Sequence, residues 1–317
     1  MSALIAPLAL LIERFTGYPN ALFKAIGHPV TWIGALITLL DRRLNTGYNR
    51  KRNGVLALVL ILAATALATI PIMLVCRAVP FGWMIEALLA TTLLAQKALA
   101  DAVCAVATSL RRSLPEGRAA VAHIVGRDPE ALDAPGVARA AIESLAESTS
   151  DGVIAPLFWL VIGGLPGVAL YKAVNTADSM IGHKTERHRD FGWASARFDD
   201  LLNLIPARLS AILIAGAAFF IKGAHPEAAW ATALRDAKRH DSPNAGWPEA
   251  AIAGALDFAL GGRRTYAGET VALPTFGTGR PDLGPDDIDR ALKLYAITLN
   301  LALALTTVTC LTLWRLA

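Results

Sequence analysis

Long apolar stretches, separated by charged ones, dominate the pattern of the chain. The stretch 55–76 carries no charged side chain, and as a helix it is long enough to cross a hydrocarbon core of about 30 Å. Apolar residues nowhere alternate with polar ones in the two-residue period of a strand, which favours helices throughout. The pattern predicts an all-α, polytopic integral membrane helical bundle with spans near 55–76, 82–96, 153–173, 204–221 and 293–316.

Three polar segments, 97–152, 174–203 and 222–289, separate these stretches. The first is amphipathic and rich in arginine, which is typical of cytoplasmic helices. Basic residues collect in the cytoplasmic loops of membrane proteins, and five of them precede the first span: Arg42, Arg43, Arg50, Lys51 and Arg52. We therefore predict a single membrane-embedded catalytic domain over 1–317, multi-pass in the cell inner membrane, with its active site facing the cytoplasm.

Two of the apolar stretches are interrupted. The stretch 153–173 contains three glycines and two prolines, and 204–221 contains Pro206 and Arg208. Broken helices are tolerated at membrane depth only where protein or a water-filled cavity covers them. If each stretch crosses once, the polar residues of 175–203 lie opposite those of 96–151. If the stretches are re-entrant or packed inside the bundle, these residues share one face, and we favour such a cytosol-facing cavity.

Composition supports a membrane protein. Hydrophobic residues make up 54% of the chain and charged residues 18%, whereas a soluble domain carries about 25% charged residues. The net charge of +4 is explained by basic cytoplasmic loops and does not indicate nucleic acid, because no basic tract is interleaved with aromatic residues. The lipid bilayer is therefore the expected large partner.

An acidic series precedes the first broken stretch. Glu143, Glu147 and Asp151 are spaced four residues apart, so they fall on one face of a persisting helix, where like charges repel. A divalent cation such as Mg²⁺, bound through oxygen, would compensate them. The alternative is a solvated acidic face, although solvated acids are not expected beside the apolar residues that follow.

A second polar cluster follows the same stretch. Asn175 and Asp178 lie one helical turn apart, and five basic or titratable groups follow within seven residues: His183, Lys184, Arg187, His188 and Arg189. Carboxylate and amide oxygens suit Mg²⁺, and lysine and arginine suit phosphate. The alternative is a basic anchor for anionic lipid, which leaves Asn175 and Asp178 unexplained.

A third cluster enters the second broken stretch. Asp199, Asp200 and Asn203 precede Arg208, which lies in an apolar run. An ionisable residue inside a membrane segment is a functional hypothesis by default. An internal salt bridge between Asp200 and Arg208 is the competing interpretation.

A fourth stretch, 239–250, is predicted to be a loop that enters a helix at Trp247–Pro248. A helix start can hold an anion on its free N–H groups. Ser242, Asn244, Trp247 and Glu249 are therefore candidate substrate-binding residues, although this stretch matches no nucleotide-binding fingerprint.

Taken together, these strings resemble the adenosylcobinamide-phosphate synthase family of cobalamin-biosynthesis membrane proteins. The resemblance runs from about Gly27 to the final span, and it is specific because long strings match in order. It implies amide-bond formation between the carboxylate of (adenosyl)cobyric acid, a corrinoid, and aminopropanol or its O-phosphate, with ATP as co-substrate and Mg²⁺. The strings are His28-Pro29-Val30 with Ile33-Gly34, Glu143–Trp159, Asn175–Gly182, Phe191–Arg208 and Ser242–Glu249.

For this chemistry the clusters take specific roles, because a carboxylate must be activated before an amine can attack it. The expected catalytic residues are Asp178, Asp199, Asp200 and His183, the last as a base for the incoming ammonium. The expected ligands of Mg²⁺ are Glu143, Glu147, Asp151 and Asp178. The expected phosphate- or substrate-binding residues are Lys184, Arg187, Arg189, Arg208, Asn175, Asn203, Ser242, Asn244, Trp247 and Glu249.

Three other classes remain open. A transporter would share the intramembrane Asp and Arg residues. It should, however, show an internal repeat, and none is visible in the sequence. A prenyl-type transferase would use Asn175 and Asp178 with Mg²⁺, but it needs more long spans. A membrane scaffold would not need acids beside bases near the membrane. Other membrane enzymes of the same pathway, or a second copy of the chain, are further candidate partners.

Overall fold

The computed structural model describes residues 4–126, 128–266 and 269–316, with side chains described except at 20 and 263–273. The chain forms two compact units, and each is assembled from separate lengths of sequence. The first comprises Met1–Ala95, Ala155–Asn203 and Leu305–Ala317, and the second comprises Gln96–Ile154 and Leu204–Ala304. The residues of the predicted site are therefore divided between two units, which are described separately below.

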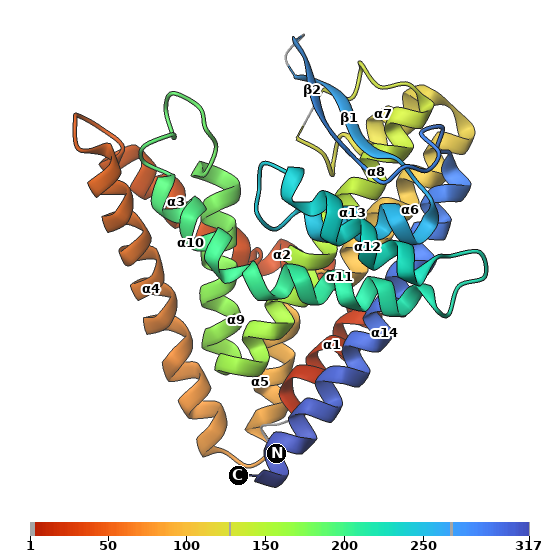
Figure 1. The fold of residues 1–317 in the computed structure, drawn as a ribbon. Helices are drawn as coiled ribbons and strands as arrows, with labels where there is room; N and C mark the ends of the chain where they lie inside the picture. The colour runs from red at the N-terminus through yellow and green to blue at the C-terminus, as the bar shows by residue number, and fades with distance from the viewer. Residues whose placement is uncertain (1–3, 127, 267–268, 317) are drawn as a thin grey trace. The chain divides into compact units, whose positions relative to one another are not determined.

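Helices account for nearly all of the regular structure (Figure 1), as predicted. In chain order they are α1 (Ile5–Thr16), α2 (Asn20–Ile26), α3 (Pro29–Leu44), α4 (Arg50–Ala78), α5 (Gly82–Thr91), α6 (Gln96–Arg112), α7 (Leu114–Val121), α8 (Ala134–Thr149), a π-helical turn (Ser150–Ile154), α9 (Ala155–Ile181), α10 (Trp193–Leu202), α11 (Leu204–Ala218), α12 (Pro226–Asp236), a 3-10 turn (Ala237–Arg239), α13 (Gly246–Leu256) and α14 (Pro285–Leu316).

Five helical stretches of the described chain are long and apolar enough to cross a membrane, which confirms the predicted fold class. A sixth is added if Trp193–Leu202 and Leu204–Ala218 count as one broken span. The sequence pattern missed one of the five, because Lys24, Asp41, Arg42 and Arg43 interrupt its apolar run. The five are Ala21–Leu44, Arg50–Ala78, Gly82–Arg112, Ala134–Ile181 and Pro285–Leu316.

One element departs from the all-helical expectation. Strands β1 (Leu260–Tyr266) and β2 (Glu269–Phe276) form an antiparallel hairpin with a register irregularity between Gly261 and Arg263. Gly261 and Gly262 have φ values of 80° and 86°, a region that disfavours residues with a side chain. The irregularity and the glycines break the strand period, which explains why alternation was not recognisable in the sequence.

In the first unit, α4 packs against α3, α9 and α10 (Figure 1). Its inner face presents Gly54, Ala57 and Ile61, whereas its outer face exposes large apolar side chains such as Leu67 and Val75. A Cβ at Gly54 would lie 1.9 Å from the carbonyl oxygen of Phe191. Small residues thus bring the backbones together, as in membrane helix pairs, while the apolar outer face suits lipid.

Helix α9 is not a straight rod. Gly164 has φ 60° and ψ −153°, which is not helical. Three residues later, a Cβ at Gly167 would lie 2.4 Å from the carbonyl oxygen of Trp159. In a continuous helix residues eight positions apart are about 12 Å apart along the axis. The chain therefore reverses at Gly164, and α9 consists of a first arm (155–163) and a second arm (165–181).

In the second unit, α13 is buried along its whole length and packs against α8, α11 and α12. Its composition explains this burial, because most of its residues are small. A Cβ at Gly254 would lie 2.3 Å from the carbonyl oxygen of Ala228, in α12. The base of the hairpin also packs on this helix, where Leu260 and Phe276 are buried partners.

Candidate functional site

In the first unit, polar residues of α9 and α10 form an acid–amide cluster consisting of Asn175, Asp178, Asp199, Asp200 and Asn203. Asp199 is only 7% exposed, and its two carboxylate oxygens each accept a hydrogen bond. The Asn175 amide donates at 3.4 Å and the Asn203 amide at 2.9 Å. A buried charge requires such partners, so the two amides fix the carboxylate of Asp199.

Tyr171 extends this network, and sequence reasoning missed it. Its hydroxyl is buried and donates to the side-chain oxygen of Asn203 at 3.0 Å. The amide of Asn203 donates to the backbone oxygen of Asp199 at 3.2 Å as well. Asn203 is therefore held from two sides, and its amide must point its nitrogen at Asp199. The spacing Tyr171–Asn175–Asp178 on one helical face was the available signal.

Three carboxylates of the cluster lie close enough to repel one another. Asp199 is repelled by Asp178 and by Asp200, and Asp178 is repelled by Asp200. His183 attracts Asp178, while Lys184 and Arg197 attract Asp200. The last of these contacts is an ion pair of 3.7 Å. The structure thus brings together the predicted residues Asn175, Asp178, His183, Lys184, Asp199, Asp200 and Asn203.

Arg187 lies in an ion pair. Its guanidinium contacts the carboxylate of Asp41, at the end of α3, at 2.6 Å. His188 lies 3.4 Å from the other oxygen of Asp41, and Asn45 donates to both Asp41 and the backbone oxygen of Arg187. These bonds fasten the segment 182–192 to the end of α3. Phosphate binding by Arg187 stays a prediction, as it does for the exposed Arg189.

In the second unit, Arg208 is fixed by neutral partners. Its guanidinium donates to the side chain of Asn244 at 2.9 Å and to the backbone oxygen of Leu204 at 2.8 Å. It also lies over the ring of Trp247, 4.8 Å from the centroid, which is cation–π geometry. An ion pair with Asp200, which belongs to the first unit, stays the alternative prediction for this arginine.

The loop before α13 is a helix start, as predicted. The hydroxyl of Ser242 accepts the N–H groups of Asn244 and Ala245 at 3.2 and 3.4 Å, so Ser242 satisfies two backbone donors before the helix. His240 was not predicted. Its Nδ1 accepts the N–H of Ser242, and its Nε2 lies 3.7 Å from the buried carboxylate of Glu249.

Glu143 contacts the hairpin. Its carboxylate is buried and accepts the N–H of Gly261 at 2.6 Å. On the other strand, the N–H of Gly277, directly after the end of β2, donates to the carboxylate of Asp236 at 2.9 Å. Two buried carboxylates therefore anchor the base of the hairpin, one at each strand. Arginine side chains in the strands belong to 263–273, outside the described side chains.

The acidic series does not share one environment. Glu143 is buried and Glu147 is exposed on α8, whereas Asp151 lies in the π-helical turn that follows. The wider turn changes the four-residue spacing on which the prediction relied. Within the described residues, no set of three or more His, Cys, Asp or Glu side chains is arranged to hold a metal ion. Mg²⁺ at Glu143, Glu147, Asp151 and Asp178 remains a prediction.

Comparisons with known proteins agree on one family. The family described as "CobD/Cbib protein" matches residues 6–295. The chain is 49% identical over 292 residues to "Cobalamin biosynthesis protein CobD" of Rhodobacter capsulatus, with 90% of each chain covered. Identity is 47% over 309 residues to the protein of that name from Brucella anthropi, with 94% of each covered. No solved structure matches the chain.

Proposed function

Because the chain belongs to the CobD/Cbib protein family, we propose that it is an enzyme of cobalamin biosynthesis that forms an amide bond. The acid substrate is (adenosyl)cobyric acid, and the amine is aminopropanol or aminopropanol O-phosphate. The product is (adenosyl)cobinamide or its phosphate. ATP activates the acid, and the reaction takes place at the cytoplasmic side of the inner membrane.

The chemistry requires activation of the acid. A carboxylate oxygen of the corrinoid attacks a phosphorus atom of ATP and expels ADP or pyrophosphate. The amine nitrogen then attacks the activated carbonyl carbon, loses a proton, and expels phosphate or AMP. In the first unit, His183 lies near Asp178, and it is the residue proposed to accept the amine proton.

The acid–amide cluster suits Mg²⁺, which neutralises phosphate charge when bound. Its ligand atoms are carboxylate and amide oxygens, the ligands that Mg²⁺ prefers, and one or two carboxylates suffice because substrate phosphates and water supply the rest. Both oxygens of Asp199 already accept amide hydrogen bonds. Asp178 and Asp200, the other two carboxylates of the cluster, are proposed to hold the ion, with Lys184 beside Asp200 for phosphate.

The loops of the first unit support a cytoplasmic site. The basic residues Arg42, Arg43, Arg50, Lys51 and Arg52 mark a cytoplasmic loop. Segment 182–192 is bonded to that loop through Asn45 and Asp41, and Lys51 lies over the ring of Trp193 at 4.0 Å. These contacts support a cytoplasmic position for the residues that follow Asp178, on the side where ATP is available.

The observation that carries the proposal is the acid–amide cluster, in which two amides hold the buried carboxylate of Asp199, in a chain of this family. Its test is direct: purified protein is incubated with cobyric acid, Mg·ATP and each amine, and the amide is sought by mass spectrometry. We expect product from the native chain and none from Asp178→Asn. Asp101→Asn serves as the matched control, because Asp101 is an exposed acid on α6 that pairs with Lys97, one turn away on the same helix.

One outcome would contradict the proposed reaction, and another would contradict the role of the cluster in it. A transporter or scaffold would form no amide with either amine. Full activity in Asp178→Asn would leave the reaction in place but remove this cluster from it.

A further inference from the structure

The reversal of α9 at Gly164 places two backbone ends inside the first unit. The first arm ends at Gly163 with free carbonyl groups, and the second arm begins at Leu165 with free N–H groups. At membrane depth such groups need partners. A negatively charged side chain from α5 lies at the N–H end, and a positively charged one from α4 lies at the carbonyl end.

Glu86, from α5, lies at the start of the second arm. Its side chain is completely buried, and its Oε1 accepts the N–H of Leu165 at 3.2 Å. A carboxylate at a helix N-terminus is favoured by the helix dipole as well as by the hydrogen bond. Glu86 therefore caps the second arm in the way that an N-cap residue would.

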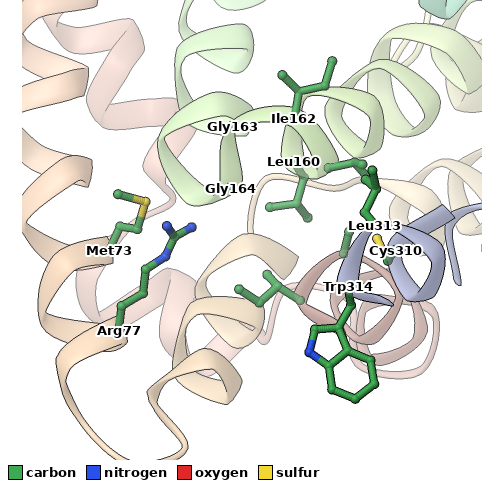
Figure 2. Close-up of a pocket in the computed structure, with 12 residues that line it drawn as sticks. Met73, Arg77, Leu160, Ile162, Gly163, Gly164, Cys310, Leu313 and Trp314 are labelled. Carbon is green, nitrogen blue, oxygen red and sulfur yellow. The ribbon is translucent and has the colours of Figure 1, made fainter. Parts of the chain in front are cut away.

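Arg77, from the last turn of α4, completes the arrangement. Its Nε lies 3.5 Å from the other carboxylate oxygen of Glu86, and a Cβ at Gly164 would meet its guanidinium at 3.1 Å. Figure 2 shows Arg77 reaching from α4 toward Gly163 and Gly164. A cation at the carbonyl end of the first arm is also the sign that the helix dipole favours.

The turn borders a cavity of about 440 Å³, which Met73, Arg77, Gly163, Gly164 and Trp314 help to line (Figure 2). Irregular backbone is tolerated inside a membrane where it lines a cavity of this kind. The arrangement thus gives the N–H of Leu165 a carboxylate partner and places a guanidinium beside Gly164, where the break borders the cavity.

We propose that α9 is a hairpin that enters the membrane and returns to the side it came from, and that Arg77 and Glu86 are the positioning residues that hold its tip. The second arm carries Tyr171, Asn175 and Asp178, so the cap that Glu86 places on Leu165, with Arg77 beside it, sets the depth and rotation of half of the acid–amide cluster. The positioning role rests on the proposed function, whereas the hairpin does not.

Cysteine labelling of the membrane topology tests the hairpin without a measurement of enzyme activity. In a background with Cys76, Cys104 and Cys310 replaced by serine, single cysteines are introduced by Glu130→Cys, Glu186→Cys and Phe81→Cys. All three positions are exposed. A membrane-impermeant maleimide is applied to sealed inverted and right-side-out vesicles.

Position 130 belongs to the polar segment 97–152, which is predicted to be cytoplasmic, so a hairpin in α9 returns the chain to that side and carries position 186 there as well. We expect both to react in inverted vesicles and the Phe81→Cys variant, at the other end of α4, to react only in right-side-out vesicles. Reaction of Glu130→Cys and Glu186→Cys from opposite sides would show a single crossing and overturn the hairpin.

The positioning role is tested with Glu86→Gln and Glu86→Ala. The glutamine keeps an oxygen for the N–H of Leu165, so we expect it to retain most of kcat. The alanine leaves the arm uncapped, so we expect kcat for amide formation to fall at least tenfold with little change in KM for Mg·ATP. Arg77→Gln, at a half-exposed position, should lower kcat less than the alanine and keeps the test available if Glu86→Ala does not fold.

Either of two results would overturn the positioning role. The first is a native kcat in Glu86→Ala when its maleimide labelling pattern is also native. The second is an equal loss of kcat in the glutamine and alanine variants. If the native chain forms no amide, the proposed function fails, and the labelling pattern still decides the hairpin.

Discussion

The buried hydroxyl of Tyr171 donates a hydrogen bond of 3.0 Å to the side-chain oxygen of Asn203, which in turn donates to the carboxylate of Asp199 at 2.9 Å. Tyr171 lies on α9, and Asn203 directly follows α10. The two helices are thus linked through Asn203, which is one of the two side chains that orient the buried acid. Asp199 therefore depends on a residue that does not touch it.

Tyr171→Phe tests this dependence. The change leaves the Asn203 oxygen without its donor, and we expect a loss of about 1–2 kcal/mol in the free energy of unfolding. Because Asn203 is then free to rotate, amide formation should fall about tenfold. Tyr295→Phe is the matched control, since the Tyr295 hydroxyl is also buried and donates to the backbone oxygen of Gln96 at 3.0 Å. It should lose similar stability in denaturation experiments but keep its activity.

Repulsion among the carboxylates gives a second prediction. Asp178→Asn removes one of three like charges, so without metal the variant should be more stable than the native chain, by on the order of 1 kcal/mol. Mg²⁺ should raise the melting temperature of the native chain and have a much smaller effect on the variant. Thermal unfolding in EDTA and in Mg²⁺ measures both effects. An identical Mg²⁺ response in the two proteins would argue against an ion at this cluster.

The local part of the site was predictable from the sequence. Asn175 and Asp178 are one turn apart, and Asp199 and Asn203 are four residues apart, so helical spacing alone places each pair on one face. The contacts between the pairs depend on how α10 returns against α9, which periodicity does not encode. Likewise, Arg187 contacts Asp41, which lies 146 residues away in the sequence, and no local pattern identifies Asp41 as its partner.

Glu86 was recognisable and was missed. It is a lone acid in the apolar stretch 82–96, and ionisable residues in such a stretch are functional candidates. The apolar run around it was interpreted only as a span. Gly163, Gly164 and Gly167 correctly indicated a broken helix, but a glycine-rich pattern does not distinguish a kink from a reversal. The reversal follows from the packing of Gly167 against Trp159.

Asp236 gives a pH prediction outside the membrane segments. Hydrogen bonds from Arg235, at 2.7 and 2.9 Å, and from the N–H of Gly277 lower the pKa of Asp236 below its ordinary value, although burial opposes this shift. A lowered pKa in the folded state stabilises the protein at pH values above the unfolded pKa of about 4. This stability is lost as the pH falls through the lower, folded pKa.

We therefore expect Asp236→Asn to be less stable than the native chain by about 2 kcal/mol near pH 7, since hydrogen bonds to a charged group are removed. The difference should shrink as the pH falls below about 4. Denaturant unfolding of both proteins between pH 3 and pH 7 measures it. A difference that does not change with pH would assign the loss to packing rather than to the charge.

Gly54→Ala tests the contact that places segment 182–192. The new Cβ would lie 1.9 Å from the carbonyl oxygen of Phe191, so the segment must move away from α4, with a loss of about 1–3 kcal/mol. Lys184 lies in that segment and attracts Asp200, so amide formation should fall as well. Gly126→Ala is the control, because a Cβ there meets nothing within 4 Å. Unfolding and product formation are compared in both variants, and native activity in Gly54→Ala would show that the cluster does not depend on the position of this segment.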